Sequence, residues 1–231
     1  MGGRMAQRLD AHDFSVGGFD TRRAIADQLG LISAASIAEA CNADAVFLSL
    51  PSSREVEEVF EGPDGILSNA RPGLIVVDMT TAEADSTRRL YKQAAMQGVA
   101  LLDAPISGGP ASAEAGTLTI MVGGDEEVLT RTRPALDVLG STIHHLGGSG
   151  NGHIAKAVNN FLNAVNLAAS SEAMVLGVQC GLDPVRLREA IKDSSGRNFA
   201  IEVRFEHILD GDYQEGALKT NLMTKDLGVY L

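Results

Sequence analysis

The sequence contains no tryptophan and only two cysteines among its 231 residues. Cys41 and Cys180 lie far apart and share no spacing typical of a metal site or a redox motif. A disulfide framework and a thiolate metal site are therefore excluded, and we expect no bound metal. We predict that both cysteines are buried thiols of a protein in a reducing cytoplasm.

Basic residues are also few. The sequence contains 19 lysines and arginines but 30 aspartates and glutamates, which gives a net charge of -11. Without a basic cluster, the sequence lacks the electrostatic footprint of a nucleic-acid-binding protein, and it disfavours an anionic membrane surface. A single anionic ligand could still bind at a helix N-terminus or beside a lysine.

Long apolar runs are absent as well. The most apolar stretch, which follows Gly150, is interrupted by polar residues such as Lys156, Asn159 and Asn160, and no signal peptide begins the chain. We therefore predict a soluble, cytoplasmic protein with no membrane partner.

Up to about Gly150, short apolar runs rich in β-branched residues alternate with helical patterns. The predicted strands are SVGGF (15–19), AVFLSL (45–50), LIVVD (74–78), VALLD (99–103), LTIMV (118–122) and TIHHL (142–146), with helices at Ala82–Gln97 and Asp125–Leu139. The early strands are apolar on both faces, as strands of a parallel sheet covered by helices must be. This alternation predicts an open α/β sheet.

After Gly150 the strand patterns stop. A long helix is expected from about Gly152 to Cys180, ended by Gly181, and further helices at Pro184–Lys192 and Asn198–Leu209. The long helix is apolar nearly all round, which predicts burial within a helical domain or between subunits. The turn GGSGNG (147–152) marks the boundary, so we expect domains at 1–149 and 150–231.

The first twenty residues, MGGRMAQRLDAHDFSVGGFD, resemble part of a dinucleotide-binding unit. In such a unit a glycine-rich turn opens a helix that points at the pyrophosphate, and the next strand ends in an acid that binds ribose hydroxyls. Gly2 is placed as the last glycine of that fingerprint and Asp20 as the acid. A capped surface helix is the alternative reading.

Two further segments, LSLPSS (48–53) and VVDMTT (76–81), follow predicted strands at the sheet edge where ligands bind, although both could be ordinary turns.

A second glycine turn follows a strand in DAPISGG (103–109). Ser107, Gly108 and Gly109 could offer a hydroxyl and successive backbone N–H groups to a carboxylate at close approach, or they could form a simple loop.

The stretch GNGHIAKAVNN (150–160) places Lys156 and Asn160 four residues apart, on one face of a helix that is otherwise apolar. A lysine in such a helix is desolvated, which lowers its pKa and suits it to proton transfer near neutral pH. A surface lysine with only its alkyl stem covered is the alternative.

Together DAPISGG, GNGHIAKAVNN and LMTKDL (222–227) resemble the β-hydroxyacid dehydrogenase family, and the resemblance covers essentially the whole chain. It implies a Rossmann-type dinucleotide-binding domain followed by an all-helical domain whose first helix often mediates dimerisation. A homodimer or homotetramer is therefore expected.

The resemblance also implies residue roles. Lys156 is expected to be the general acid/base, assisted by Asn160, and the substrate is expected to bind at Ser107, Gly108 and Gly109. Expected cofactor contacts are Gly2, Asp20, Leu50, Pro51, Thr81 and Lys225.

The implied function is hydride transfer between NAD(P) and a small β-hydroxy acid of the 3-hydroxyisobutyrate, tartronate semialdehyde/glycerate or threonate type. Asp20 favours NAD because a carboxylate repels a 2′-phosphate, whereas Arg22 and Arg23 leave NADP open. The alternatives are an imine reductase-like enzyme, which normally lacks the lysine, and a non-catalytic NAD-binding-like protein.

The sequence departs from the family pattern at both ends. Members begin with a strand and GxGxMG, whereas this sequence starts at MG, and they continue beyond the KDL motif through further helices. We therefore expect the first strand and part of the helical domain to be missing. Weak binding of NAD is also expected, because most of the N–H groups that cradle the pyrophosphate precede Gly2.

Overall fold

A computed structural model of the chain describes residues 1–22, 24, 28–211, 223, 224, 226 and 228. It forms two compact units, Met1–Lys156 and Ala157–Leu231. The division falls inside one helix, α9 (Asn151–Gln179), whose first turn and a half belongs to the first unit.

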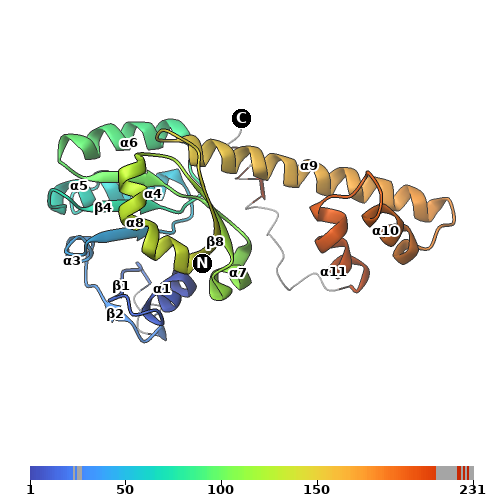
Figure 1. Cartoon of the computed structure of the whole chain (residues 1–231), viewed down its shortest axis with the longest axis horizontal. Helices are drawn as coiled ribbons and strands as arrows, with labels where there is room; N and C mark the ends of the chain where they lie inside the picture. Colours follow the sequence, from blue (N-terminus) through green and yellow to red (C-terminus); the bar gives the residue numbers. More distant parts are fainter. Residues whose placement is uncertain (23, 25–27, 212–222, 225, 227, 229–231) are drawn as a thin grey trace. The chain divides into compact units, whose positions relative to one another are not determined.

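The first unit alternates strands and helices (Figure 1). Its elements are α1 (Gly2–Asp10), β1 (Gly17–Gly18), β2 (Ile32–Ser33), α3 (Ile37–Ala40), β3 (Ala45–Leu48), α4 (Ser53–Glu61), α5 (Ile66–Asn69), β4 (Ile75–Asp78), α6 (Ala84–Met96), β5 (Ala100–Asp103), β6 (Ile106–Ser107), α7 (Gly109–Ala115), β7 (Leu118–Val122), α8 (Glu126–Leu139) and β8 (Gly140–His145). The predicted strands are all present, while β2 and β6, two residues each, were not predicted. These pairs carry too short a pattern to be recognised without their neighbours.

Parallel pairing dominates the unit. Strands β3, β4 and β5 run parallel in that order, β1 pairs parallel with β2, and β7 pairs parallel with β8. Strand β6 runs antiparallel to its neighbour β7. A bridge between Asp103 and Gly123 links β5 to the end of β7. The strands form three hydrogen-bonded sheets, and the predicted α/β fold with mainly parallel strands is confirmed.

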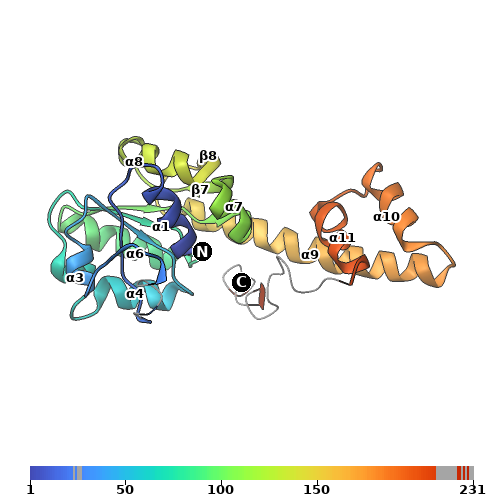
Figure 2. The same ribbon diagram turned by 90° about the horizontal axis from the view of Figure 1, so that it is seen from below.

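Successive residues of β4 point to opposite faces, and helices cover both. Val77 packs in one core cluster with Met5 of α1 and Leu136 of α8. Val76 packs in the other with Phe60 of α4 and Leu90 of α6. Figure 2 shows α1, α7 and α8 gathered near β7, in agreement with the contacts between α1 and both helices. The sheet is therefore doubly covered, as its apolar strands predicted.

The second unit is helical in its described part. It contains the rest of α9, α10 (Pro184–Lys192), the π-helix η1 (Ala200–Arg204) and α11 (Phe205–Leu209). Gly181, with φ +90°, follows α9 as predicted, and Asp183 caps α10 by accepting a hydrogen bond from the Arg186 N–H at 2.9 Å. The predicted helix Asn198–Leu209 is divided, since its first part is the π-helical turn η1.

One side of α9 is not buried within the chain, so burial inside the helical domain does not hold for this side, and burial between subunits stays a prediction. A stripe of apolar residues along the helix is exposed, comprising Ile154, Val158, Leu162 and Val165, and Val175, Leu176 and Val178 follow near its end. By length and composition α9 could also cross a membrane, with a mean hydropathy of 1.3 over 18 residues, against our expectation from its polar interruptions. One such helix is weak evidence, because helices buried in soluble proteins pass the same test. A cytoplasmic location stays a prediction.

The cysteines are both free, as predicted, but only Cys41 is buried. Burial raises the pKa of the Cys41 thiol. Cys180, which directly follows the last residue of α9, is exposed, contrary to expectation.

Candidate active site at the carboxyl ends of the strands

The loops after β3 and β4 are joined by side-chain hydrogen bonds. The Leu50 N–H donates to the Thr80 hydroxyl oxygen at 3.1 Å, and the Glu83 N–H donates to the Ser53 hydroxyl oxygen at 2.8 Å. Pro51 and Thr81, two predicted cofactor contacts, lie within these same two loops. The two loops therefore form one surface at the edge of the sheet where ligands bind in open α/β folds.

The start of α1 lies beside this edge. A Cβ on Gly2 would lie 3.3 Å from the Cβ of Ser49, directly before Leu50. The first turn of α1 has no acidic residue and no side-chain cap. Helix N-termini of this kind suit an anionic group, so the chain's residues here fit the pyrophosphate of a dinucleotide.

Asp20 lies two residues after β1, as predicted for the ribose-binding acid. Its carboxylate accepts hydrogen bonds from the Arg22 N–H at 2.8 Å and from the Arg22 guanidinium Nε at 3.2 Å. The backbone hydrogen bond and then the side-chain one lower the pKa of Asp20. Arg22 is thus engaged with Asp20, and Arg23 lies outside the described residues.

The turn Ser107–Gly109 ends β6 and opens α7. Gly108 has φ +132° and Gly109 has φ +77°, a region that residues with a Cβ rarely adopt. A Cβ on Gly108 would also lie 2.7 Å from the Cβ of Ser112, whereas the space around Gly109 is open. The backbone therefore requires both glycines, and the open side at Gly109 leaves room for a ligand to approach.

Lys156 and Asn160 are both buried, with 9% and 8% of their surfaces exposed, and they lie one turn apart on α9. The Asn160 amide donates to the Asp226 carboxylate at 2.8 Å. Asp226 belongs to the predicted KDL motif, so the structure brings two of the three family motifs together within the second unit. The motif's lysine, Lys225, lies outside the described residues.

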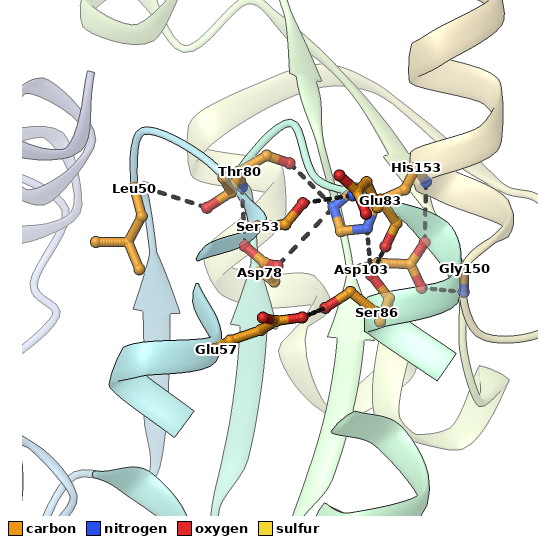
Figure 3. A network of polar contacts seen from close by, with 11 residues as sticks. Leu50, Ser53, Glu57, Asp78, Thr80, Glu83, Ser86, Asp103, Gly150 and His153 are labelled. Atoms are coloured by element: carbon orange, nitrogen blue, oxygen red, sulfur yellow. Dashed lines mark hydrogen bonds and ion pairs between the residues drawn. The ribbon is translucent and has the colours of Figure 1, made fainter. Parts of the chain in front are cut away.

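A buried polar network that the sequence did not reveal occupies the same edge of the sheet (Figure 3). It joins Asp78, Thr80, Thr87, Asp103 and His153, all of them buried. Burial raises the pKa of Asp78, opposed by the nearby His153 and by the hydrogen bonds from Thr80. The sequence contains one indication of this network: His153 precedes Lys156 by three residues and so lies on the same face of the helix.

The described residues contain no group of three histidine, cysteine, aspartate or glutamate side chains that could hold a metal ion. What they offer is a buried amine, a glycine turn with free approach, and a helix N-terminus beside two strand-end loops. Groups of these kinds are suited to binding a nucleotide and to proton transfer.

Two family models match the chain and together cover nearly all of it. The NAD binding domain of 6-phosphogluconate dehydrogenase matches residues 1–147. The NAD-binding domain of NADP-dependent 3-hydroxyisobutyrate dehydrogenase matches residues 150–231. The chain belongs to the β-hydroxyacid dehydrogenase family.

Individual relatives agree with this family. The chain is 46% identical to 2-(hydroxymethyl)glutarate dehydrogenase of Eubacterium barkeri over 83% of its own length and 64% of that protein's. It is 40% identical to NAD-dependent L-serine dehydrogenase of Pseudomonas aeruginosa, over 99% of the chain and 80% of the relative. The structure resembles 3-hydroxyisobutyrate dehydrogenase of Mycobacterium tuberculosis with L-serine, with a TM-score of 0.91, 33% identity, and coverage of 99% of this chain and 81% of that one.

Membership in the β-hydroxyacid dehydrogenase family confirms two expectations from the sequence. The first unit has the Rossmann-type fold with a helical domain after it, and the cofactor is NAD(P), since both matched models describe NAD-binding domains. The chain spans less than two thirds of the length of the first relative, and four fifths of the second.

Proposed function

We propose that the chain transfers a hydride between NAD(P) and the hydroxymethyl group of a small β-hydroxy acid. The observation that carries the proposal is the buried Lys156, placed at the start of α9 in the motif GNGHIAKAVNN. An imine reductase-like activity is disfavoured by this lysine.

The chemistry divides between cofactor and protein. When bound, NAD(P) accepts the hydride that leaves the hydroxyl-bearing carbon. The neutral amine of Lys156 takes the hydroxyl proton, so the alcohol loses a hydride and a proton and becomes an aldehyde. In the reverse direction the ammonium of Lys156 returns the proton. Asn160 orients the hydroxyl, and the hydroxyl of Ser107 with the N–H groups of the following glycines binds the substrate carboxylate.

The relatives indicate a substrate class. 2-(Hydroxymethyl)glutarate, L-serine and 3-hydroxyisobutyrate all carry a primary alcohol on the carbon next to the one that bears the carboxylate. We propose that this chain acts on the same class, the 2-substituted 3-hydroxypropionates. Glycerate, the reduced partner of tartronate semialdehyde, also belongs to it.

A substrate panel tests the function. These four hydroxy acids are incubated with NAD or NADP, and reduced cofactor is followed by absorbance. The assay uses the chain as printed and a longer protein that begins with a strand and GxGx before Met1, so that cofactor affinity does not decide the outcome. We expect reduced cofactor with at least one acid. Its absence with every acid and both cofactors, in both proteins, would contradict the proposal.

We predict a preference for NAD over NADP. Asp20 carries a negative charge at the proposed ribose-binding position. It also holds Arg22, a cation that could attract a 2′-phosphate, in hydrogen bonds at 2.8 and 3.2 Å. Asp20→Asn should lower the ratio of kcat/KM for NAD to that for NADP by about 10–100-fold, as expected for a hydrogen bond to a charged group. Asp10→Asn, at an exposed site at the end of α1, is the matched control. A wild-type preference for NADP would show that the arginines dominate.

We also propose that the chain forms a homodimer through the exposed stripe of α9. Ile154, Val158, Leu162 and Val165 are each more than 40% exposed, an unusual density of apolar surface on one helix. The double change Val158→Glu and Leu162→Glu should convert a dimer to a monomer in sedimentation analysis. Met96→Glu, at an apolar site that is 80% exposed on α6, should leave the mass unchanged. A monomeric wild-type protein would contradict the proposal.

A further inference from the structure

His153 is a deeply buried titratable residue close to Lys156 in the sequence. It lies in the first turn of α9, with 1% of its surface exposed, three residues before the lysine. Both ring nitrogens have partners. Nδ1 lies 2.7 Å from the Thr87 hydroxyl oxygen. Nε2 lies 3.0 Å from the Thr80 carbonyl oxygen (Figure 3). The ring is therefore held from two elements, the end of β4 and the helix α6.

These partners determine which nitrogen carries the proton. A carbonyl oxygen can only accept, so Nε2 must be an N–H that donates to Thr80. In the neutral ring, Nδ1 then accepts from the Thr87 hydroxyl. That hydroxyl has a second acceptor, the Glu83 carbonyl oxygen at 3.0 Å, to which it can turn if Nδ1 gains a proton. The site thus orients the imidazole ring in either charge state.

The backbone of the same helical turn is held by Asp103 at the end of β5. One carboxylate oxygen accepts from the Gly150 N–H at 2.7 Å and the other from the His153 N–H at 3.0 Å. A carboxylate from a distant strand therefore caps α9. Asp103 thus holds the main chain of this turn, and the two ring contacts of His153 hold a side chain of the same turn.

At its other end the network reaches the loops proposed to contact the cofactor. Thr80 donates its N–H to Asp78 at 3.0 Å, and its hydroxyl oxygen accepts from the Leu50 N–H at 3.1 Å. Thr80 also precedes Thr81 in the chain. A continuous series of hydrogen bonds, part-buried at Leu50 and buried at His153, thus leads from Leu50 through Thr80 to His153, entirely within the first unit.

We propose that His153 is a positioning residue, which holds the turn of α9 that carries Lys156 in register with the cofactor-binding edge of the sheet. The proposal rests on the proposed function of Lys156. Lys156 follows His153 by three residues, about 4.5 Å along the helix, so a shift of the imidazole moves the amine with it. Displacements of about 1 Å at a reacting group can cost on the order of 100-fold in rate.

Substitutions that keep or remove the two ring contacts separate positioning from packing. His153→Leu fills space without hydrogen bonds, whereas His153→Gln has an amide N–H that can donate to Thr80 and an oxygen that can accept from Thr87. Thr87, the hydrogen-bond partner of Nδ1, offers a matched pair: Thr87→Val removes the hydroxyl and Thr87→Ser keeps it. His144→Leu, at an exposed site on β8, is the control for loss of a histidine.

We expect His153→Leu to lower kcat by about 10–100-fold with KM for the cofactor changed by less than about threefold. His153→Gln should recover most of this loss in kcat. The kcat of Thr87→Ser should be higher than that of Thr87→Val, and the kcat of His144→Leu should equal that of the wild type. If His153→Leu does not fold, the Thr87 pair decides. Wild-type kcat in the leucine and valine variants, or glutamine no better than leucine, would overturn the proposal.

A measurement without substrate or cofactor complements the kinetics. Amide hydrogen exchange of residues 150–157 should accelerate in His153→Leu, return towards the wild-type rate in His153→Gln, and stay unchanged in Lys156→Ala. Unchanged exchange in His153→Leu would also overturn the proposal. If instead Lys156→Ala keeps full turnover, the proposed function fails, and the exchange data still decide whether His153 holds the turn.

Discussion

Lys156→Ala is expected to lower kcat by about 100-fold or more, because the hydroxyl proton then has no positioned acceptor. The dissociation constant for NADH should change by less than about twofold, since Lys156 is proposed to move a proton and is not a predicted cofactor contact. Steady-state kinetics should therefore show a strongly reduced kcat, and NADH fluorescence should show that NADH still binds. Lys92→Ala, at an exposed site on α6, is the control.

Two further substitutions sharpen this test. Lys156→Arg keeps the positive charge but cannot give up its proton near neutral pH, so it should remain slow. Asn160→Ala should cost less than Lys156→Ala, because the amide orients a group and transfers nothing. Near-normal turnover in either lysine variant would remove Lys156 from the mechanism.

Gly152→Ala is expected to have the second-largest effect. A Cβ there would lie 2.8 Å from the Asp103 carbonyl oxygen and 2.9 Å from its carboxylate, and would also collide with the Met121 carbonyl oxygen. Two of these atoms are backbone of β5 and β7, which hydrogen bonds between Asp103 and Gly123 at 2.8 and 3.1 Å hold in place. The first turn of α9 must therefore move, and the position of Lys156 moves with it.

Overpacking of this kind costs about 1–3 kcal/mol, which corresponds to a fall in melting temperature of roughly 2–4 °C for each kcal/mol in a chain of this size. We also expect kcat to fall by at least about tenfold, since the reacting amine is displaced. Gly148→Ala, where a Cβ would meet nothing within 4 Å, should match the wild type in both measurements. Equal melting temperatures for the two variants would show that α9 does not depend on this close approach.

Much of the first unit could be predicted from sequence because its strands carry long apolar patterns. LIVVD and VALLD became β4 and β5 within one residue, and the glycine at 181 marked the end of α9. The two-residue strands β2 and β6 exist only because a neighbouring strand supplies their hydrogen bonds. The π-helical turn η1 within a predicted helix likewise has no signal in a periodicity of 3.6 residues.

The candidate site likewise contains residues that the sequence predicted and residues that it did not. The buried placement of Lys156 and Asn160 on one helix could be predicted because a polar pair at a spacing of four stands out on an apolar helix; their catalytic roles stay a prediction. The contact of His153 with Thr87 spans 66 positions and that of Asp103 with Gly150 spans 47, so both depend on how the strands and helices are arranged. Asp226 as the partner of Asn160 is equally remote in sequence. Local patterns thus indicate the residues that we propose to react, whereas the residues that we propose to position them emerge only from the folded structure.

Transfer of isotope tests the central claim most directly. A 3-hydroxy acid that turns over is prepared with deuterium on its hydroxymethyl carbon and incubated with the enzyme and unlabelled NAD(P), and the reduced cofactor is analysed by mass spectrometry. Direct hydride transfer predicts that the reduced cofactor gains one deuterium from the substrate, even in ordinary water. Reduced cofactor that contains no deuterium would contradict the account.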